Sequence, residues 1–141
     1  MRKSTGDLFQ ELQKSPCELG KYLKNNPESF VENDITTFWE ALIQKSGRSK
    51  SNIINKADFS YCYFYDVING RKSPSRDKVV RLILSMQLSL DDCQQALKIS
   101  GKSCLYPRVK RDSILIYAIE NRLSVFQLSE LLAQYGEEEL K

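Results

Sequence analysis

The sequence predicts an all-α protein, and three observations support this fold class. Apolar residues recur at helical spacing, serines stand where helices would begin, and glycines stand where they would end. The clearest amphipathic stripe is formed by Ile35, Phe38, Trp39, Leu42 and Ile43. No convincing strand or hairpin appears in the sequence. We therefore expect helices from one end of the chain to the other.

Length and composition limit the class of protein. The 141 residues are enough for one domain with a core, and 41% hydrophobic with 28% charged residues is ordinary for a globular protein. No apolar run approaches the roughly 18 residues of a membrane span, and no apolar segment follows the basic start as in a signal peptide. We expect a cytoplasmic protein without a membrane partner.

The side chains restrict the available chemistry. The chain has no histidine, and its cysteines are scattered without a C-x-x-C pair: Cys17, Cys62, Cys93 and Cys104. Imidazole-activated nucleophiles are therefore excluded, and neither a zinc site nor another cofactor is expected. The acidic residues fall where helix caps and solvated faces explain them. We expect reduced, mostly buried thiols and no enzymatic activity.

Residues 1–33 predict a helical extension that precedes the main domain. A first helix should cover Gly6 to Lys14. A second should open at Ser15-Pro16-Cys17-Glu18, which combines a serine cap, a proline at the first helical position and a capping-box glutamate. It should end near Asn25-Asn26-Pro27.

Residues 34–101 predict a central domain of five helices. Asp34 is expected to cap the first, and Ser49, Ser60, Ser75 and Ser89 the next four. The expected helices are Ile35–Ser46, Lys50–Ala57, Tyr61–Asn69, Ser75 to Met86, and Ser89 to Gly101.

Residues 102–141 predict a helix hairpin that packs on the central domain to give one compact unit. Its helices should run from about Arg108 to Asn121 and from Val125 to Tyr135, the second with a Ser124–Gln127 capping box. A shift of 35 positions places Arg76–Gly101 on Arg111–Gly136 without a gap. We interpret this match as two similar hairpins packed on each other, although common capping rules alone would also produce it.

Positive charge is concentrated in the middle of the chain. Nine basic residues lie between Lys45 and Arg81, against the three acidic residues Asp58, Asp66 and Asp77. Such a basic patch is typical of a nucleic-acid-binding face. A solvated helix surface is the alternative.

The segment from Ser49 to Ser75 predicts a helix-turn-helix, in which the second helix enters a major groove. It resembles the phage-repressor (Xre-type) family, whose pattern continues as N-G-R/K-x-x-P-S, and Asn69-Gly70-Arg71-Lys72-Ser73-Pro74-Ser75 matches that continuation. The resemblance covers about residues 34–101 and implies a lambda-repressor-like five-helix DNA-binding domain. Residues 105–112 are similar to longer regulators of Firmicutes bacteria that carry the same C-terminal helix pair.

The resemblance implies a set of DNA-binding positions. Base contacts would come from Tyr61, Cys62 and Asp66, and phosphate contacts from Lys50 and from Asn69 to Lys72. Ser60, the expected cap of the recognition helix, Tyr65 and Arg76 are added to these positions. The expected site therefore comprises Lys50, Ser60, Tyr61, Cys62, Tyr65, Asp66, Asn69, Arg71, Lys72 and Arg76. The expected core positions of this segment are Ile53, Ala57, Phe59, Phe64, Val67 and Ile68.

The sequence departs from the family at the recognition helix. Tyr61 and Cys62 stand where glutamine or serine is common, and an aspartate at 66 repels phosphate. Exposed tyrosines also suit a protein interface, and one or two of the three tyrosines at 61, 63 and 65 should pack partly on the core. Two functions therefore remain open: a transcriptional regulator that binds double-stranded DNA, and a helix-turn-helix recruited to bind a protein partner.

The C-terminal hairpin has two further expected roles. Arg108, Lys110 and Arg111 would extend the basic face, or form a solvated first helical turn. The apolar run from Ile114 to Ile119 encircles a helix, so it should be buried in the domain or lie in a dimer contact. By analogy with repressors of this type, we expect a homodimer formed through these helices.

Overall fold

The computed structural model describes residues 31–141, with side chains from Ile35 onward, and this part of the chain contains helices and no strand. The helices are α3 (Val31–Ser46), α4 (Lys50–Ala57), α5 (Tyr61–Ile68), α6 (Arg76–Met86), α7 (Leu90–Ile99), α8 (Lys110–Glu120) and α9 (Val125–Gln134). The all-helical prediction is confirmed for these residues. The two helices expected before residue 30 lie outside them. None of the described helices has the length and apolar character needed to span a membrane.

The serine caps form as the sequence predicts. In each case the serine hydroxyl accepts a hydrogen bond from the backbone N–H three residues later, as seen at Ser49, Ser60, Ser75, Ser89 and Ser124. At α9 the bond is reciprocal, because the Gln127 side chain accepts from the Ser124 backbone in a complete capping box.

Two helix starts differ from the prediction. Helix α3 begins at Val31, so Asp34 lies inside the helix and the prediction that it is the cap is wrong. Residues 31–34 contain neither proline nor glycine, so nothing in the sequence stops the helix from continuing upstream. Helix α8 begins at Lys110, two residues after the expected Arg108, and its cap Val109 offers no side-chain bond.

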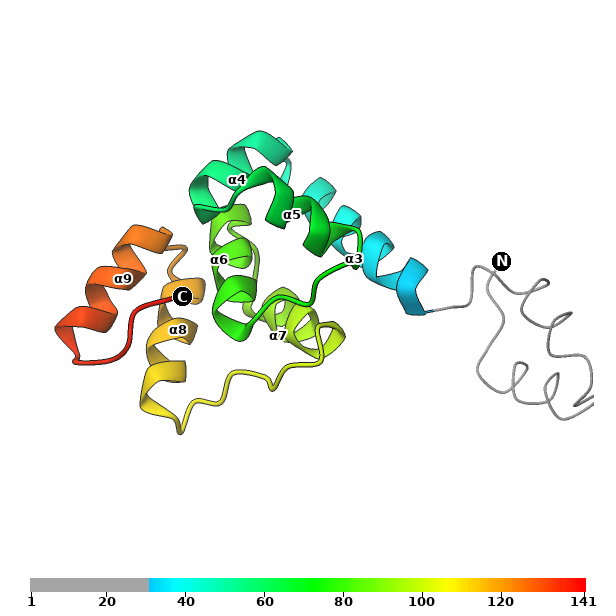
Figure 1. Cartoon of the computed structure of the whole chain (residues 1–141). Helices are drawn as coiled ribbons and strands as arrows, with labels where there is room; N and C mark the ends of the chain where they lie inside the picture. The colour runs from blue at the N-terminus through cyan, green and yellow to red at the C-terminus, as the bar shows by residue number, and fades with distance from the viewer. Residues whose placement is uncertain (1–30) are drawn as a thin grey trace, which may run out of the picture.

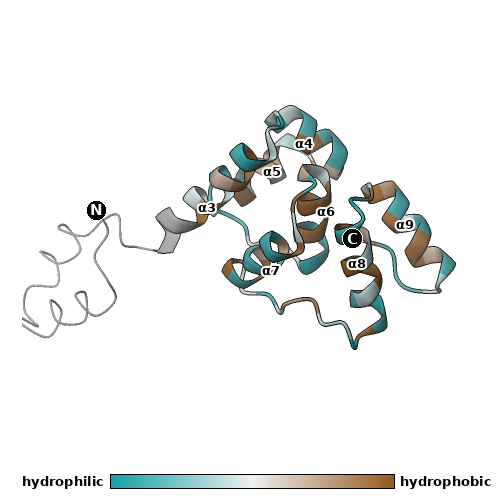
Figure 2. Ribbon diagram, turned by 180° about the vertical axis from the view of Figure 1, so that it is seen from behind, coloured by the Kyte–Doolittle hydropathy of each residue, from teal (hydrophilic) through white to brown (hydrophobic). Residues whose placement is uncertain are grey.

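Helix α6 is the centre of the fold. It contacts α4, α7, α8 and α9, and every residue from Val79 to Met86 is buried. Figure 1 shows α6 between α4 and α5 on one side and α8 and α9 on the other, and Figure 2 shows the apolar character of its ribbon. One hydrophobic core joins Trp39 and Phe64 to Leu115 and Leu132, so residues 34–101 and 102–141 share it.

The two C-terminal hairpins have the same local structure. Helices α7 and α9 correspond residue for residue after a shift of 35 positions. The residue after α6, Gln87, has φ 52°, and its counterpart Arg122 has φ 53°. The glycines that follow the second helices, Gly101 and Gly136, have φ 71° and 72°. The predicted similarity of the two hairpins is confirmed.

The hairpins also contact each other reciprocally. Arg76 Nη2 lies 2.8 Å from Asp112 Oδ2, while Arg111 Nη1 and Nη2 each lie 3.0 Å from an oxygen of Asp77, the two pairs being related by the same shift. The reciprocity continues at the other bonds of these arginines and aspartates: Arg76 to Ser103 O and Cys104 O, Arg111 to Glu138 O and Glu139 O, Tyr106 N to Asp112, and Lys141 N to Asp77. Such an exchange, in which residue i meets j and j meets i, is the signature of a two-fold axis. Residues 76–106 and 111–141 are therefore related by an internal pseudo-two-fold.

Candidate nucleic-acid interface

Helices α4 and α5 are two short helices joined by a tight turn. Helix α4 ends at Ala57, and Asp58 takes a left-handed conformation with φ 58°, which aspartate tolerates better than most residues. The Phe59 N–H then bonds to Ile54 O at 3.0 Å, and Ser60 caps α5. Three residues, Asp58-Phe59-Ser60, thus separate the two helices.

Helix α5 has a buried side and an exposed side. Phe64, Val67 and Ile68 are at most 1% exposed. Tyr61 is 54% and Tyr65 38% exposed, and the remaining exposed positions are Cys62 and Asn69. This division was predicted from the apolar spacing and is confirmed except at Asp66, which was expected with the exposed residues and is half-buried. Four side chains, which carry phenol, thiol and amide groups, are therefore available to a partner along one helix face.

Two of the exposed aromatic side chains are held by neighbours on other helices. The Tyr61 hydroxyl lies 3.1 Å from Ser51 Oγ on α4. The Tyr65 ring packs edge-on against Phe64, with centroids 5.4 Å apart, and Lys50 Nζ lies 5.8 Å from its centroid. Lys50 also forms an ion pair with Glu40 at 3.0 Å. Both tyrosines are presented in defined positions, and Lys50 lies beside the second.

The aspartate of α5 is paired with the cations that follow the helix. Asp66 Oδ1 is 3.5 Å from Arg71 Nε, and Oδ2 is 3.5 Å from Lys72 Nζ. The Asp66 carbonyl also accepts from the backbone N–H of both residues, at 2.8 and 3.1 Å. Because Arg71 and Lys72 are 66% and 58% exposed, they remain open to solvent while Asp66 orients them. Asp66 thus lies under the basic residues of the loop and is only 27% exposed.

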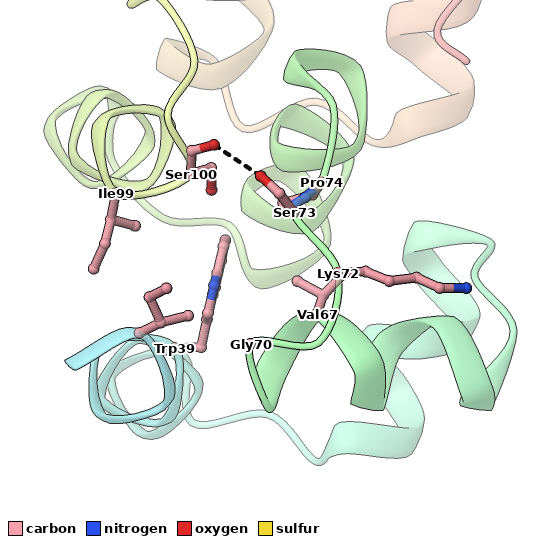
Figure 3. A pocket seen from close by; sticks show the side chains of 9 residues that line it. Trp39, Val67, Gly70, Lys72, Ser73, Pro74, Ile99 and Ser100 are labelled. Carbon is pink, nitrogen blue, oxygen red and sulfur yellow. Dashed lines mark hydrogen bonds between the residues drawn. The ribbon is translucent and has the colours of Figure 1, made fainter. Parts of the chain in front are cut away.

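The loop after α5 is fixed at both ends. Gly70 has φ 75°, a left-handed conformation that turns the chain out of the helix. The Ser73 hydroxyl donates to Ser100 O at 2.8 Å, and Pro74 is buried (Figure 3). The cavity under the loop holds about 60 Å³, well below the roughly 300–1,000 Å³ of small-molecule sites, so we assign it no ligand.

A cluster of aromatic rings and lysine ammonium groups lies at the start of α5. The Phe59 and Tyr63 rings pack at 90°, with centroids 5.2 Å apart. Lys78 Nζ lies 5.6 Å from each centroid, and Lys72 Nζ lies 5.8 Å from the Tyr63 ring. Burial, and then the charge of Arg81, lowers the pKa of Lys78, while burial raises the pKa of Tyr63. Tyr63 is half-buried, as expected for one of the three tyrosines.

Lys78, Ser51 and Glu40 were not among the sequence-predicted site residues. Ser51 and Glu40 reach the site from the preceding helices, and only the helix packing brings them to Tyr61 and Lys50. Lys78 offered a weak signal, because it stands in the first turn of α6 directly after the predicted basic loop.

Arg76 does not join this surface, which corrects its predicted phosphate contact. Its Nε, Nη1 and Nη2 are all engaged, with Ser103 O, Cys104 O and Asp112. Arg81 is likewise only 9% exposed and donates to Ala57 O and Asp58 O. The basic patch is therefore smaller than the sequence suggests, because two of its nine cations stabilise the fold.

The cations at the start of α8 are also directed elsewhere. Arg111 pairs with Asp77, and Lys110 donates to Tyr135 O at 2.8 Å. In Figures 1 and 2 the start of α8 lies at the opposite end of the molecule from α5. The extension of the basic face, one of the two roles considered for Arg108, Lys110 and Arg111, is therefore wrong.

The thiols differ from the prediction in their burial. Cys93 is buried, Cys104 half-buried and Cys62 exposed on α5, while Cys17 lies outside the described residues. Burial raises the pKa of Cys93 to about 12. Among the described residues no group of histidine, cysteine or carboxylate side chains is arranged to hold a metal ion.

No family model, curated protein or solved structure matches the chain. The surface consists of an exposed helix face with hydroxyl, thiol and amide groups, with Lys50 beside Tyr65 and Arg71 and Lys72 after the last turn. Such an arrangement can bond to base edges and attract phosphates.

Proposed function

We propose that this protein is a DNA-binding transcriptional regulator of the lambda-repressor-like, Xre type, with α5 in the major groove. The observation that carries the proposal is the two-sided α5, held by a three-residue turn. Its inner side is sealed into the core, and its outer side presents Tyr61, Cys62, Tyr65 and Asn69. A helix displayed in this way, with the preceding helix across it, is what major-groove docking requires.

The exposed cations supply the attraction to the phosphate backbone. Lys50 lies beside Tyr65, and Arg71 and Lys72 follow the last turn of α5, so positive charge lies along the recognition helix and beyond its C-terminal end. In this proposal a phosphate replaces Asp66 as the partner of Lys72. Neutralised phosphates release counterions, which makes the affinity depend on salt.

The decisive experiment is a salt titration of duplex-DNA binding, starting from fragmented genomic DNA to select a bound sequence. Lys72→Ala should weaken binding to every sequence and reduce the slope of log K against log salt by about one. Arg108→Ala is the matched control, because Arg108 is exposed two residues before α8, whose start lies at the opposite end of the molecule from α5 (Figure 1), and its slope should equal that of the parent. An unchanged slope in Lys72→Ala contradicts the role given to that lysine.

One observation favours a second function. Tyr61 and Tyr65 are large, exposed and fixed in place, which suits anchor residues of a protein interface. If duplex DNA does not bind even at low salt, and a protein partner is captured by the parent but not by Tyr61→Ala or Tyr65→Ala, the helix-turn-helix is a protein-interaction module.

A further inference from the structure

The internal pseudo-two-fold allows the two hairpins to be compared face by face. In the first hairpin, α4 packs along α6, and the side chains of Val79, Leu82 and Ala96 are fully buried. The same shift that relates the hairpins places Ile114, Tyr117 and Leu131 at the corresponding positions of the second. Nothing in the described chain covers that face: Tyr117 is 56% exposed, and Ile114 and Leu131 are half-buried.

The uncovered face is a groove between α8 and α9. It holds about 360 Å³ and is lined by Ser113, Ile114, Tyr117, Leu131 and Tyr135. Tyr135, the residue after α9, is 52% exposed. We propose that this groove binds the same groove of a second copy of the chain, with the two α8 helices antiparallel across a two-fold axis. The proposal does not depend on DNA binding.

The charges along α8 favour a second copy as the occupant. Lys110, Ser113, Tyr117 and Glu120 recur at three- and four-residue spacing, so they share one helix face. The helix thus carries a cation at the start of this face and an anion at its end, both exposed. If the two α8 helices run antiparallel and the two-fold axis crosses them at the level of residue 115, Lys110 of each copy lies beside Glu120 of the other.

The shapes along α8 agree with the same register. That register sets Ser113 of one copy opposite Tyr117 of the other. The small serine side chain lies on the groove, so it leaves room for the aromatic ring, and the two-fold repeats the fit. Lys110 donates to Tyr135 O and its Nζ lies 3.8 Å from Glu137 Oε1. Because the side chain is 65% exposed and its ammonium has three donors, a further donor can reach Glu120 of the other copy.

The charge pairing supplies a test that a contact within one chain cannot mimic. Lys110 and Glu120 are ten positions apart on one helix, about 15 Å along its axis, so they do not meet in one copy. Lys110→Glu and Glu120→Lys should each weaken the dimer by about tenfold, and the double variant should return to within about threefold of the parent. A double variant as weak as the product of the two single effects overturns the proposed register.

The oligomeric state of the full chain is to be measured by sedimentation equilibrium over about a hundredfold range of concentration. We expect a reversible monomer–dimer equilibrium that Tyr117→Glu shifts toward monomer by about a hundredfold, because a charge enters an apolar contact. Phe126→Glu is the matched control and should leave the equilibrium unchanged, since Phe126 is 72% exposed on α9 but does not line the groove. Circular dichroism melts confirm that each variant is folded.

Two results overturn the proposal. One is a full chain that stays monomeric at every concentration. This result is expected if residues 1–30 of the same chain, or an unrelated protein, occupy the groove instead of a second copy. The other is a dimer that Tyr117→Glu leaves intact.

Discussion

The reciprocal ion pairs between the hairpins should contribute measurably to stability. Asp77 accepts two hydrogen bonds of 3.0 Å from Arg111 and one of 3.0 Å from the Lys141 backbone, with side chains 16% and 21% exposed. An exposed pair contributes about 0–1 kcal/mol, and breaking a fully buried one costs about 3–5 kcal/mol. Asp77→Ala should therefore cost about 2 kcal/mol, which lowers the Tm by roughly 8 °C for a chain of this size.

A double-mutant cycle isolates the pair from other effects of the substitutions. Asp77→Ala, Arg111→Ala and the double variant, unfolded in urea, should give a coupling of about 1.5 kcal/mol. The symmetry-related cycle of Arg76 with Asp112 should give a coupling of similar size. Asp91 is exposed in the first turn of α7, so Asp91→Ala combined with Arg111→Ala should be additive.

Acid should abolish the Asp77 coupling. Burial by itself would raise the pKa of Asp77, but the hydrogen bonds from Arg111 and Lys141, with the charges of Arg111 and Arg76, outweigh it and lower the pKa. The coupling is therefore fully present above the unfolded-state pKa of about 3.9 and is lost as the pH falls through the folded-state pKa. A coupling below about 0.5 kcal/mol at neutral pH, or one unaffected by acid, refutes the reasoning.

Three further outcomes follow from local features. Gly70→Ala should lower the free energy of unfolding, measured in a urea titration, by about 1 kcal/mol. The cause is the backbone, because φ is 75° while the new Cβ would lie an unstrained 3.7 Å from Ile35. Gly70→Asn should lower it by less, and equal losses would contradict a backbone origin. Ser124→Ala should lower the free energy of unfolding by about 1 kcal/mol through loss of the capping box, whereas Ser129→Ala, inside α9, should not. In a variant that keeps Cys93 as its only cysteine, a thiol reagent should react only when the protein opens, because Cys93 is 0% exposed and burial also raises its pKa to about 12. Rapid labelling of the folded protein would contradict this burial.

Local signals predicted the helices well because their determinants are short in range. A serine hydroxyl three residues from its backbone partner, and a glycine after the last helical residue, act within one turn. For this reason Lys50–Ala57 and Val125–Gln134 begin at the expected residues. Asp34 shows the limit of such signals, because a residue able to cap does so only where the helix actually begins.

The candidate surface around α5 was predicted in part, for a different physical reason. Apolar spacing was enough to separate the two sides of α5, since burial follows helical periodicity. The roles of the cations depended on contacts between distant segments: Arg76 and Arg111 are committed to carboxylates 36 and 34 positions away. Nothing in the local sequence distinguishes these arginines from Arg71, which is exposed, so charge counting overestimated the basic patch.

Because one segment of the chain joins the two hairpins, their association does not depend on protein concentration. Two separate hairpins would associate only at sufficient concentration, whereas residues 102–109 tether them at an effective concentration in the millimolar range. Closure of this internal interface is thus independent of the amount of protein in the cell. The α8–α9 hairpin should accordingly detach and return as one cooperative unit, with its amide protons exchanging together before those of α6.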